Sequence, residues 1–505
     1  MHVDTGPDNN ATLPPGVPWY KLLTKYHWFV FVVAALGWLF DCLDQQLFIL
    51  ARPAAMKELL AGTGIPEAAM KGEILKWSDI ATAVFIAGWA TGGLVFGMLG
   101  DRIGRTKTMM FTILIYSACT GLSALSTSVY DFAFYRFLTG LGVGGEFAVG
   151  VALIAEAMPA AARPYALASL QALSAIGNIL AALINLGLGV AEEHGLPTSP
   201  WRIMFMIGAL PALLALIIRL KLKEPEAWTK VSHEGATAKQ LGSYRELFST
   251  PLWRKHALLG LVLACSGVVG LWGVGFYTPD LIRSVQTPKV TKQVYEQEIA
   301  AAEGATAESL KRVQAAIESK TSDQLPAEDQ AIQEAMDKKV SSKVSLYTSF
   351  TSIAINIGAF FGMYGFGVLA QRIGRKPTFA IALISAFTIT VIVFHSLTDM
   401  WQIMVLVPIM GFCQLSLFAG YAVYLPELFP TRLRSTGTSF CYNVGRFVAA
   451  FGPLVKIAIT GFFITNTFGY AEPLRPAGMA MCGVFLIGLL VLPFLPETKG
   501  KPLPE

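Results

Sequence analysis

Five ionisable side chains stand inside long apolar stretches of this sequence. They are Asp41, Asp44, Arg136, Glu146 and Arg446. An ionisable group in the hydrocarbon core of a bilayer costs at least about 2.5–3.5 kcal/mol on insertion scales, so each one needs a specific role. A carboxylate beside a guanidinium group can take up and release a proton, whereas an arginine without an acidic partner can hold an anion.

Three of these residues are predicted to lie at similar depth. If a helix over 28–51 begins at one membrane surface, Asp41 lies roughly 20 Å deep, and Asp44 lies one turn further. A helix over 130–157 returns from the other surface and brings Arg136 into the same half of the membrane. We therefore predict a proton site with Asp41 as the preferred carrier, then Asp44; the alternative is a structural ion pair that never titrates.

Glu146 lies further along the second of these helices, in a glycine-rich stretch that lets a neighbouring helix pack closely. It could carry a proton, pair with Arg446, or form a structural hydrogen bond. The corresponding places in the second half of the chain hold the uncharged residues Ser416 and Val407. The titratable groups are therefore expected to concentrate in the first half.

Arg446 points to the chemistry of a ligand. In a helix that begins near Ser435 it lies roughly 15 Å deep, close to the midplane. Its guanidinium group stays charged at every accessible pH and can hold a carboxylate through two parallel hydrogen bonds. Asn443 lies one turn below it on the same face. We expect these two residues to bind a carboxylate; the alternative is a structural pair with Glu146.

Further polar and aromatic residues inside the apolar stretches are candidates for the same binding site. They are Gln45, Gln171, Asn178, Trp272, Tyr277, Asn356, Gln414 and Tyr442. Most of the polar ones could equally join one helix to another by hydrogen bonds. The tryptophan and the first tyrosine could instead belong to an interfacial aromatic belt.

Two short patterns each occur twice, about 270 residues apart. Gly-x-x-x-Asp-Arg-x-Gly-Arg over 97–105 returns over 367–375, with Gln371 in place of the aspartate, and Glu-x-x-Pro-x-x-x-Arg over 156–163 returns over 427–434. Their order and doubling indicate two parallel repeats. We expect their residues to form a gate at one membrane surface: Gly97, Asp101, Arg102, Gly104, Arg105, Glu156, Arg163, Arg372, Arg375, Glu427 and Arg434.

Within this gate we expect Glu156 to pair with Arg163, and Glu427 with Arg434. One exposed pair is worth only about 0–1 kcal/mol, so a network is needed to favour one state of the gate. Because Gln371 carries no charge, the first repeat should form the stronger lock. The alternative is that the basic residues only set the orientation of the chain in the membrane.

The helices that must carry these residues follow from composition. Of 505 residues, 54% are hydrophobic and 14% are charged, which excludes an ordinary soluble domain. Apolar windows of roughly 20 residues can cross a bilayer. We predict twelve, at 28–51, 79–99, 107–127, 130–157, 165–190, 202–221, 256–280, 346–370, 378–397, 400–425, 436–463 and 475–495.

The same windows divide the chain into two halves. We predict a first six-helix bundle over 1–222, a linker over 223–255, and a second bundle over 256–505. Basic residues gather in the loops on one side, which predicts that both termini are cytoplasmic. The polar segment 283–343 should form an external helical insertion, either a lid or docking element or an insertion without a role in transport. The six cysteines all fall inside predicted helices and indicate no disulfide framework.

The repeated patterns, together with Pro-Glu-Thr-Lys-Gly over 496–500, resemble the major facilitator superfamily. The resemblance covers nearly the whole chain and implies an all-α membrane protein with twelve helices in two pseudo-symmetric bundles. The last motif is similar to the sugar porters. Asp-x-x-Asp over 41–44, Gly-Gly-Glu over 144–146 and Tyr-Asn-Val-Gly-Arg over 442–446 are more similar to the aromatic-acid and sialate/monocarboxylate symporters.

We therefore expect a proton-coupled importer of a small organic anion: a monocarboxylate, an aromatic acid or an acidic sugar. The alternative is a sugar or polyol porter, favoured by the last motif and disfavoured by Arg446. No enzyme, cofactor or metal pattern stands out, and the net charge of +5 says nothing about nucleic acid, for which we expect no binding. We expect a monomer in the inner membrane, with protons, the anion and lipid as its partners.

Overall fold

The structure is a computed structural model that describes residues 18–504 apart from 62, 66, 194–195, 234–240, 275–277, 319–324, 451–458, 460–461 and 464–473. The described residues form helices and connecting turns, and no strand occurs among them. Two predicted binding residues fall outside this description, Tyr277 entirely and Trp272 as far as its side chain is concerned.

The first half of the chain forms one helical bundle. After the short helix η1 (Trp19–Leu22), its helices are α1 (Lys25–Leu60), α2 (Glu67–Arg102), α3 (Arg105–Ser123), α4 (Val129–Ala157), α5 (Arg163–Glu193), α6 (Pro200–Gly208) and α7 (Ala212–Lys221). Two short helices, α8 (Glu226–His233) and α10 (Tyr244–Ser249), follow in the segment that joins the halves.

The second half forms a matching bundle. Its long helices are α11 (Pro251–Val274), α12 (Thr278–Ala301), α13 (Ala305–Glu318), α14 (Ala327–Ile373), α15 (Arg375–Ser396), α16 (Met400–Tyr424), α17 (Arg434–Ala450), α19 (Leu474–Met481) and α20 (Gly483–Val491). Three short turns of 3₁₀-helix are η4 (Leu425–Leu428), η5 (Thr431–Leu433) and η6 (Leu492–Phe494).

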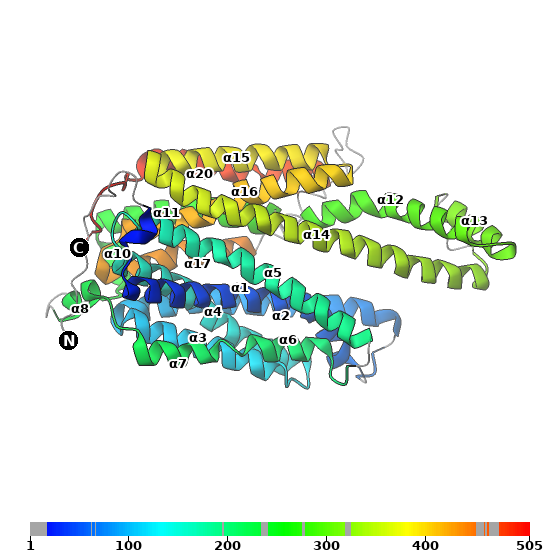
Figure 1. Ribbon diagram of the computed structural model, residues 1–505, viewed down its shortest axis with the longest axis horizontal. Coiled ribbons are helices and arrows are strands. Elements are labelled where there is room, and N and C mark those ends of the chain that lie inside the picture. Colours follow the sequence, from blue (N-terminus) through cyan, green and yellow to red (C-terminus); the bar gives the residue numbers. More distant parts are fainter. Residues whose placement is uncertain are drawn as a thin grey trace.

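The two bundles lie side by side, and both ends of the chain lie at the same end of the molecule (Figure 1). We call this end the terminal face; it includes Trp19, Pro504 and the turn over 101–105. The opposite end is the far face. Helices α5 and α14 come together near the terminal face and diverge toward the far face (Figure 1).

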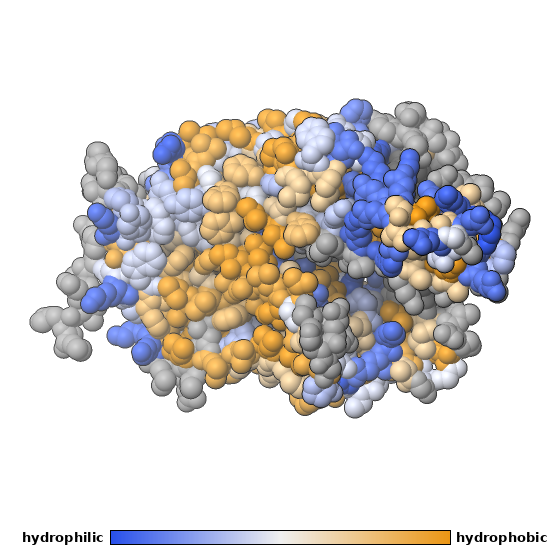
Figure 2. Space-filling view, turned by 45° about the vertical axis from the view of Figure 1, so that its right-hand side comes forward, coloured by the Kyte–Doolittle hydropathy of each residue, from blue (hydrophilic) through white to orange (hydrophobic). Residues whose placement is uncertain are grey.

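Nine helices in the described part of the chain are long and apolar enough to cross a membrane. The other three expected spans correspond to α3, to α6 with α7, and to α17. Helices α3 and α17 are rich in hydroxyl side chains, and the turn at 209–211 separates α6 from α7. Apolar side chains cover the middle of the surface between more polar ends (Figure 2). The predicted all-α, two-bundle membrane fold is confirmed.

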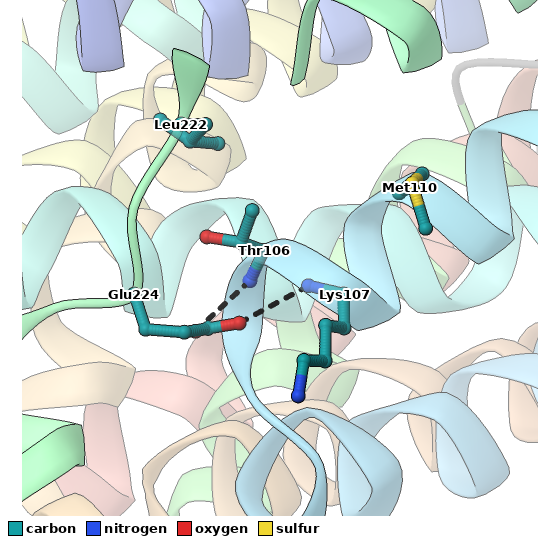
Figure 3. Close-up of a pocket in the computed structure, with 5 residues that line it drawn as sticks. All are labelled: Thr106, Lys107, Met110, Leu222 and Glu224. Carbon is teal, nitrogen blue, oxygen red and sulfur yellow. Dashed lines mark hydrogen bonds between the residues drawn. The ribbon is translucent and has the colours of Figure 1, made fainter. Parts of the chain in front are cut away.

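The duplication is visible in two helix starts at the terminal face. Glu224 accepts hydrogen bonds from the backbone N–H groups of Thr106 and Lys107, both at 3.2 Å, at the start of α3 (Figure 3). Glu497 accepts from the N–H groups of Arg375 (2.9 Å) and Lys376 (3.0 Å) at the start of α15. In each half an acidic residue beyond the bundle therefore caps a helix within it.

The turn before each of these helices needs glycine. Gly104 and Gly374 precede α3 and α15 with φ of 112° and 104°. A Cβ atom at either position would also meet the capping carboxylate, that of Glu224 or that of Glu497. Left-handed backbone and close approach together exclude other residues there.

The predicted insertion is helical. Helices α12 and α14 continue beyond the bundle at the far face, and α13 lies between them in the chain (Figure 1). They share a separate apolar core that includes Val290, Tyr295, Val313 and Met336. The insertion is also fixed to its own half, because the Lys289 ammonium group pairs with Asp399 at 2.5 Å.

Replacing the second capping residue, Glu497→Gln, should destabilise the protein by about 0.5–1 kcal/mol near neutral pH, the usual worth of such a cap. Burial raises the pKa of Glu497, but backbone hydrogen bonds from Arg375, Lys499 and Lys376 outweigh it and hold the pKa below 4.5. The stabilisation should therefore be present above that pH and disappear as pH falls through the lowered value.

Thermal unfolding in detergent at a series of pH values measures this effect. The difference in Tm between wild type and Glu497→Gln should shrink on acidification, and the exposed control Glu226→Gln should show no such difference. A gap that stays constant down to acidic pH would contradict the capping role.

Candidate functional site

The two halves meet at the terminal face through a carboxylate of one half that caps a helix of the other. Asp101, near the end of α2, accepts hydrogen bonds from the backbone N–H groups of Ser435 (3.2 Å) and Thr436 (2.8 Å) and from the Thr436 hydroxyl (2.6 Å). Both N–H groups belong to the first turn of α17, where they have no intrahelical acceptor and the helix dipole favours a negative charge. Asp101 is fully buried, so water screens this contact little.

Arginines of both halves share one glutamate beside this cap. The Glu156 carboxylate, at the end of α4, accepts two hydrogen bonds from Arg105 (3.2 and 2.8 Å) and one from Arg434 (2.7 Å). Arg105 also pairs with Asp101 at 2.8 Å. All four side chains are buried, and removing any one leaves an uncompensated charge at the boundary between the halves.

The second half has a corresponding pair within itself. Arg375 donates two hydrogen bonds to Glu427, at 3.0 and 2.8 Å. The predicted pairs Glu156–Arg163 and Glu427–Arg434 are therefore wrong. Each glutamate lies instead opposite the arginine at the start of α3 or α15, because the buried Gly-Arg turn directs that side chain toward the end of α4 or α16.

The contact between the halves is lopsided. Gln371, the counterpart of Asp101, accepts a hydrogen bond from Arg375 of its own half at 3.3 Å. Arg163, at the start of α5, is buried, and no carboxylate within the described chain lies at ion-pair distance from it. The other predicted gate residues support the same face: Gly97 packs against Ser439, Arg102 donates to the Leu241 carbonyl, and the Arg372 carbonyl accepts from Lys499.

Arg136 pairs with Asp44 deeper in the first half. Its Nη1 lies 3.6 Å from the Asp44 carboxylate, and both side chains are fully buried. Hydroxyl groups of Thr120, Ser123 and Thr139 accept hydrogen bonds from its Nε and Nη2 at 2.8–3.2 Å. The guanidinium group also lies near the rings of three phenylalanines, 4.7–5.9 Å from their centroids: Phe48, Phe132 and Phe205. Arg136 and Asp44 thus form a buried ion pair, but Nη1 and Oδ2, the two atoms that face each other, are too far apart for a hydrogen bond and have no other partner among the described residues.

Asp41 is in a different position from the one predicted, since it does not pair with Arg136. Both of its carboxylate oxygens are buried without a hydrogen-bond partner in the described chain. The charges that act on it most strongly are those of Glu146, Asp44 and Arg446. Glu146 accepts one hydrogen bond, from Thr112 at 2.7 Å, and its other oxygen is unpartnered among described residues.

A glycine on α1 admits the Glu146 carboxylate next to this group. A Cβ atom at Gly37 would overlap Glu146 Oε1, and Gly37 lies one turn before Asp41. Two buried carboxylates thus approach each other with few donors, an arrangement in which the ionised forms repel and a shared proton relieves the repulsion.

Arg446 projects from α17 between two aromatic rings. Its Cζ atom lies 3.9 Å from the centroid of Trp89 and 4.3 Å from that of Tyr442. Nη1 donates to Asn443 at 2.7 Å, whereas Nε has no partner in the described chain. No described carboxylate lies within ion-pair distance, so the alternative pair with Glu146 is not formed. The guanidinium group thus lies close to two aromatic rings, and its Nε is left as a donor for a ligand.

The remaining predicted binding residues divide into two groups. Asn178 of α5 donates to Asn356 of α14 at 3.0 Å and so joins the halves, and Gln414 donates to Thr390 at 2.6 Å inside the second half. Gln171 is buried with its side-chain oxygen unpartnered among the described residues, and Gln45 is half-buried. Asn178, Asn356 and Gln414 are thus engaged in contacts between helices.

Sequence reasoning missed two kinds of residue. Trp89 and Phe147 complete the aromatic surround, since Phe147 stacks on Tyr442 with centroids 4.2 Å apart. Aromatic residues are common in membrane helices and gave no distinct signal. Thr112 and Thr120, which bond Glu146 and Asp44, do repeat at four-residue spacing together with Tyr116, and that spacing was a readable signal.

Comparison with known families agrees with this architecture. Residues 32–245 match the family Sugar (and other) transporter, and residues 332–505 match the family Major Facilitator Superfamily. The proton:xylose symporter XylE, solved with a bound sugar analogue, superposes with a TM-score of 0.65 at 18% identity, over 95% of this chain and 98% of that one.

The chain belongs to the major facilitator superfamily. It is accordingly a membrane transporter and not an enzyme. Within the superfamily it is 28% identical to a metabolite transport protein of Haemophilus influenzae, over 95% of this chain and 99% of that protein. It is 26% identical to the sialic acid transporter NanX of Escherichia coli (88% and 90% covered) and to the cis,cis-muconate transport protein of Acinetobacter baylyi (79% and 81%).

The two buried aspartates of α1, Asp41 and Asp44, should contribute differently to the stability of this transporter. Arg136→Gln should lower stability by about 3–5 kcal/mol, because Asp44 then remains buried and unpaired. Asp41→Asn should be neutral or stabilising, because it removes a carboxylate without hydrogen bonds. Thermal unfolding in detergent, with the double variant Asp44→Asn/Arg136→Gln, measures the coupling. Equal destabilisation by Asp41→Asn and Asp44→Asn would contradict two separate groups.

Loss of the cap between the halves should open the terminal face. In Asp101→Asn, a buried cysteine reporter at Ser439→Cys should react about tenfold faster with a water-soluble maleimide, the equivalent of losing a charge-assisted hydrogen bond of ~1.5 kcal/mol. The reporter alone gives the reference rate, and Gln371→Asn in the second half is the matched control. An unchanged rate in Asp101→Asn would show that the cap does not hold this face closed.

Proposed function

We propose that this protein is a proton-coupled importer of a small organic anion, with Arg446 as the anchor for the substrate carboxylate. The observation that carries the proposal is the state of this arginine: a buried cation close to two aromatic rings, with no acidic partner in the described chain and with Nε unpartnered there. A buried charge without a counterion is costly, and a carboxylate that accepts two hydrogen bonds along the guanidinium edge would offset that cost.

The proposed coupling runs through Asp41. While Asp41 is ionised it attracts Arg446, and it is also repelled by Glu146. A proton on this pair of carboxylates removes the competing negative charge, so that an incoming anion interacts with Arg446 alone. Proton and anion then favour each other's binding, and the coupling is reciprocal. Asp44 is not assigned as the coupling carboxylate, because it already pairs with Arg136 at 3.6 Å and accepts a hydrogen bond from Thr120.

The terminal-face contacts are proposed to act as the gate. Asp101 and Glu156 hold α17 and Arg434 of the second half, so the substrate would enter from the far face. Release at the terminal face would require these buried contacts to separate. We further propose that the terminal face is cytoplasmic, in an inner membrane, and that the transporter acts as a monomer, since each step uses groups of one chain.

The relatives support an anion as substrate. Two of them are named as transporters of sialic acid and of cis,cis-muconate, both carboxylates. The competing proposal, a sugar or polyol porter, is supported by the match to Sugar (and other) transporter over the first half and by the fold of XylE. A neutral sugar would leave the charge of Arg446 without a partner, and we therefore prefer the anion.

Vesicles loaded with a pH indicator test the proposal directly. Purified protein should acidify the interior when offered benzoate, cis,cis-muconate or sialic acid, and not when offered xylose. Arg446→Gln should slow the acidification about 100-fold or more, because two charge-assisted hydrogen bonds are lost.

Arg312→Gln, the same substitution in the external insertion, is the matched control and should leave the rate unchanged. Acidification by xylose that survives Arg446→Gln would establish the sugar-porter alternative. Uptake of labelled anion without a pH change would reject proton coupling and retain the anion.

A further inference from the structure

Helix α3 presents hydroxyl groups to the buried carboxylates of the first half. Thr112 donates to Glu146 at 2.7 Å, and Thr120 donates to Asp44 at 2.7 Å. Tyr116 lies midway between them in sequence. Residues four apart share one helix face, so the three hydroxyl side chains form a single column, which we call the hydroxyl column.

The middle member of the column is the least satisfied. Tyr116 is fully buried, and its hydroxyl has no hydrogen-bond partner in the part of the chain that the structure describes. The carboxylates that act on it are those of Asp41, Glu146 and Asp44. An unsatisfied buried hydroxyl costs about 1–3 kcal/mol, and the nearby Asp41 oxygens are unsatisfied as well. These two groups complement each other as donor and acceptor.

Close packing holds the column against the acids. A Cβ atom on Gly142 of α4 would lie 2.8 Å from Tyr116 Cβ, so only glycine allows α3 and α4 to approach this closely. On the α1 side, a Cβ atom at Gly37 would overlap Glu146 Oε1, so a close approach needs glycine there as well. The column is thus enclosed between α1 and α4, out of contact with water.

The second half provides an internal comparison. The offset that relates Gly104 to Gly374 relates Thr112 and Tyr116 to Ala382 and Ala386. The repeat that has no counterpart of Glu146 therefore also lacks these two hydroxyls. Thr390, the counterpart of Thr120, bonds the Ala386 carbonyl and Gln414 instead. Helix packing alone does not require the hydroxyls, since the same helix position packs with alanine.

We propose that Thr112, Tyr116 and Thr120 form a proton-transfer path that links Asp44, Asp41 and Glu146 along α3. In each step a protonated carboxyl group gives its proton to a hydroxyl oxygen while that hydroxyl passes its own proton to the next carboxylate. Each hydroxyl ends unchanged, so atoms and charge balance. The path rests on the proposed proton coupling, and it names the residues that would deliver the proton.

The dimensions suit such a path. The column covers roughly 12 Å along α3 at the helical rise per residue. Arg136 lies at its far-face end, where it bonds Thr120 (3.2 Å), and Glu146 lies at the end nearer the terminal face. The charged groups around the column are Asp41 and Asp44 of α1, Arg136 and Glu146 of α4, and Arg446 of α17.

Two transport modes separate delivery of protons from binding. Net uptake driven by a proton gradient requires protons to pass, whereas exchange of labelled for unlabelled anion across the membrane requires no net proton movement. The probe is whichever of benzoate, cis,cis-muconate and sialic acid acidifies wild-type vesicles fastest. Tyr116→Phe should slow proton-driven uptake about tenfold or more and leave exchange near the wild-type rate.

Matched variants complete the test. Tyr295→Phe removes a buried hydroxyl in the insertion core and should change neither mode. Thr120→Val should act like Tyr116→Phe, and Thr120→Ser, which keeps the hydroxyl, should restore the rate. In the wild-type protein, deuterium oxide should slow proton-driven uptake more than it slows exchange.

Three outcomes would decide against the path. Unchanged uptake in Tyr116→Phe, or equal loss of uptake and exchange, would leave these hydroxyls with a structural role only. If none of the three acids acidifies wild-type vesicles, the proposed function fails first, and the path fails with it. The wild-type and variant measurements therefore separate the two proposals.

Discussion

The Glu156 carboxylate is the contact on which the arrangement of the two halves depends. It accepts hydrogen bonds from Arg105 of its own half and from Arg434 of the other. Beside it, Asp101 caps the first turn of α17. Buried charges of this kind are stabilising only while every partner is present. At the terminal face the two halves are therefore joined by a network in which each buried charge depends on the others.

The deeper charges form two groups with different properties. Asp44 and Arg136 form an ion pair at 3.6 Å, and neighbouring hydroxyl groups donate to Asp44 or accept from Arg136. Asp41, Glu146 and Arg446 are close enough to interact electrostatically but form no ion pair among the described residues. In a medium of low dielectric, groups left in this condition are the ones whose charge a proton or an anion alters most.

The two halves share the structure of the turns at the terminal face but differ in the charged residues inside the bundle. Both halves have the same glycine turn, an arginine–glutamate pair and a carboxylate cap on the following helix. The caps come from Glu224 and Glu497, residues outside the bundles. Only the first half adds Asp101, the deeper carboxylates Asp41, Asp44 and Glu146, and the hydroxyl column. The second half thus supplies Arg446, and the first half supplies the deeper carboxylates.

The sequence by itself determined the two-bundle membrane fold, the doubled motifs of the terminal face and the five buried charges, because hydropathy, repeated motifs and the cost of a charge in an apolar span are local properties. It could not determine which charges meet. Asp41 and Asp44 are one turn apart, yet only Asp44 reaches Arg136. Glu156 pairs with Arg105 and Arg434 instead of Arg163. Helix rotation and crossing set these partners, and they depend on packing against residues distant in sequence, such as Gly37 and Gly142, which only the tertiary structure brings into contact.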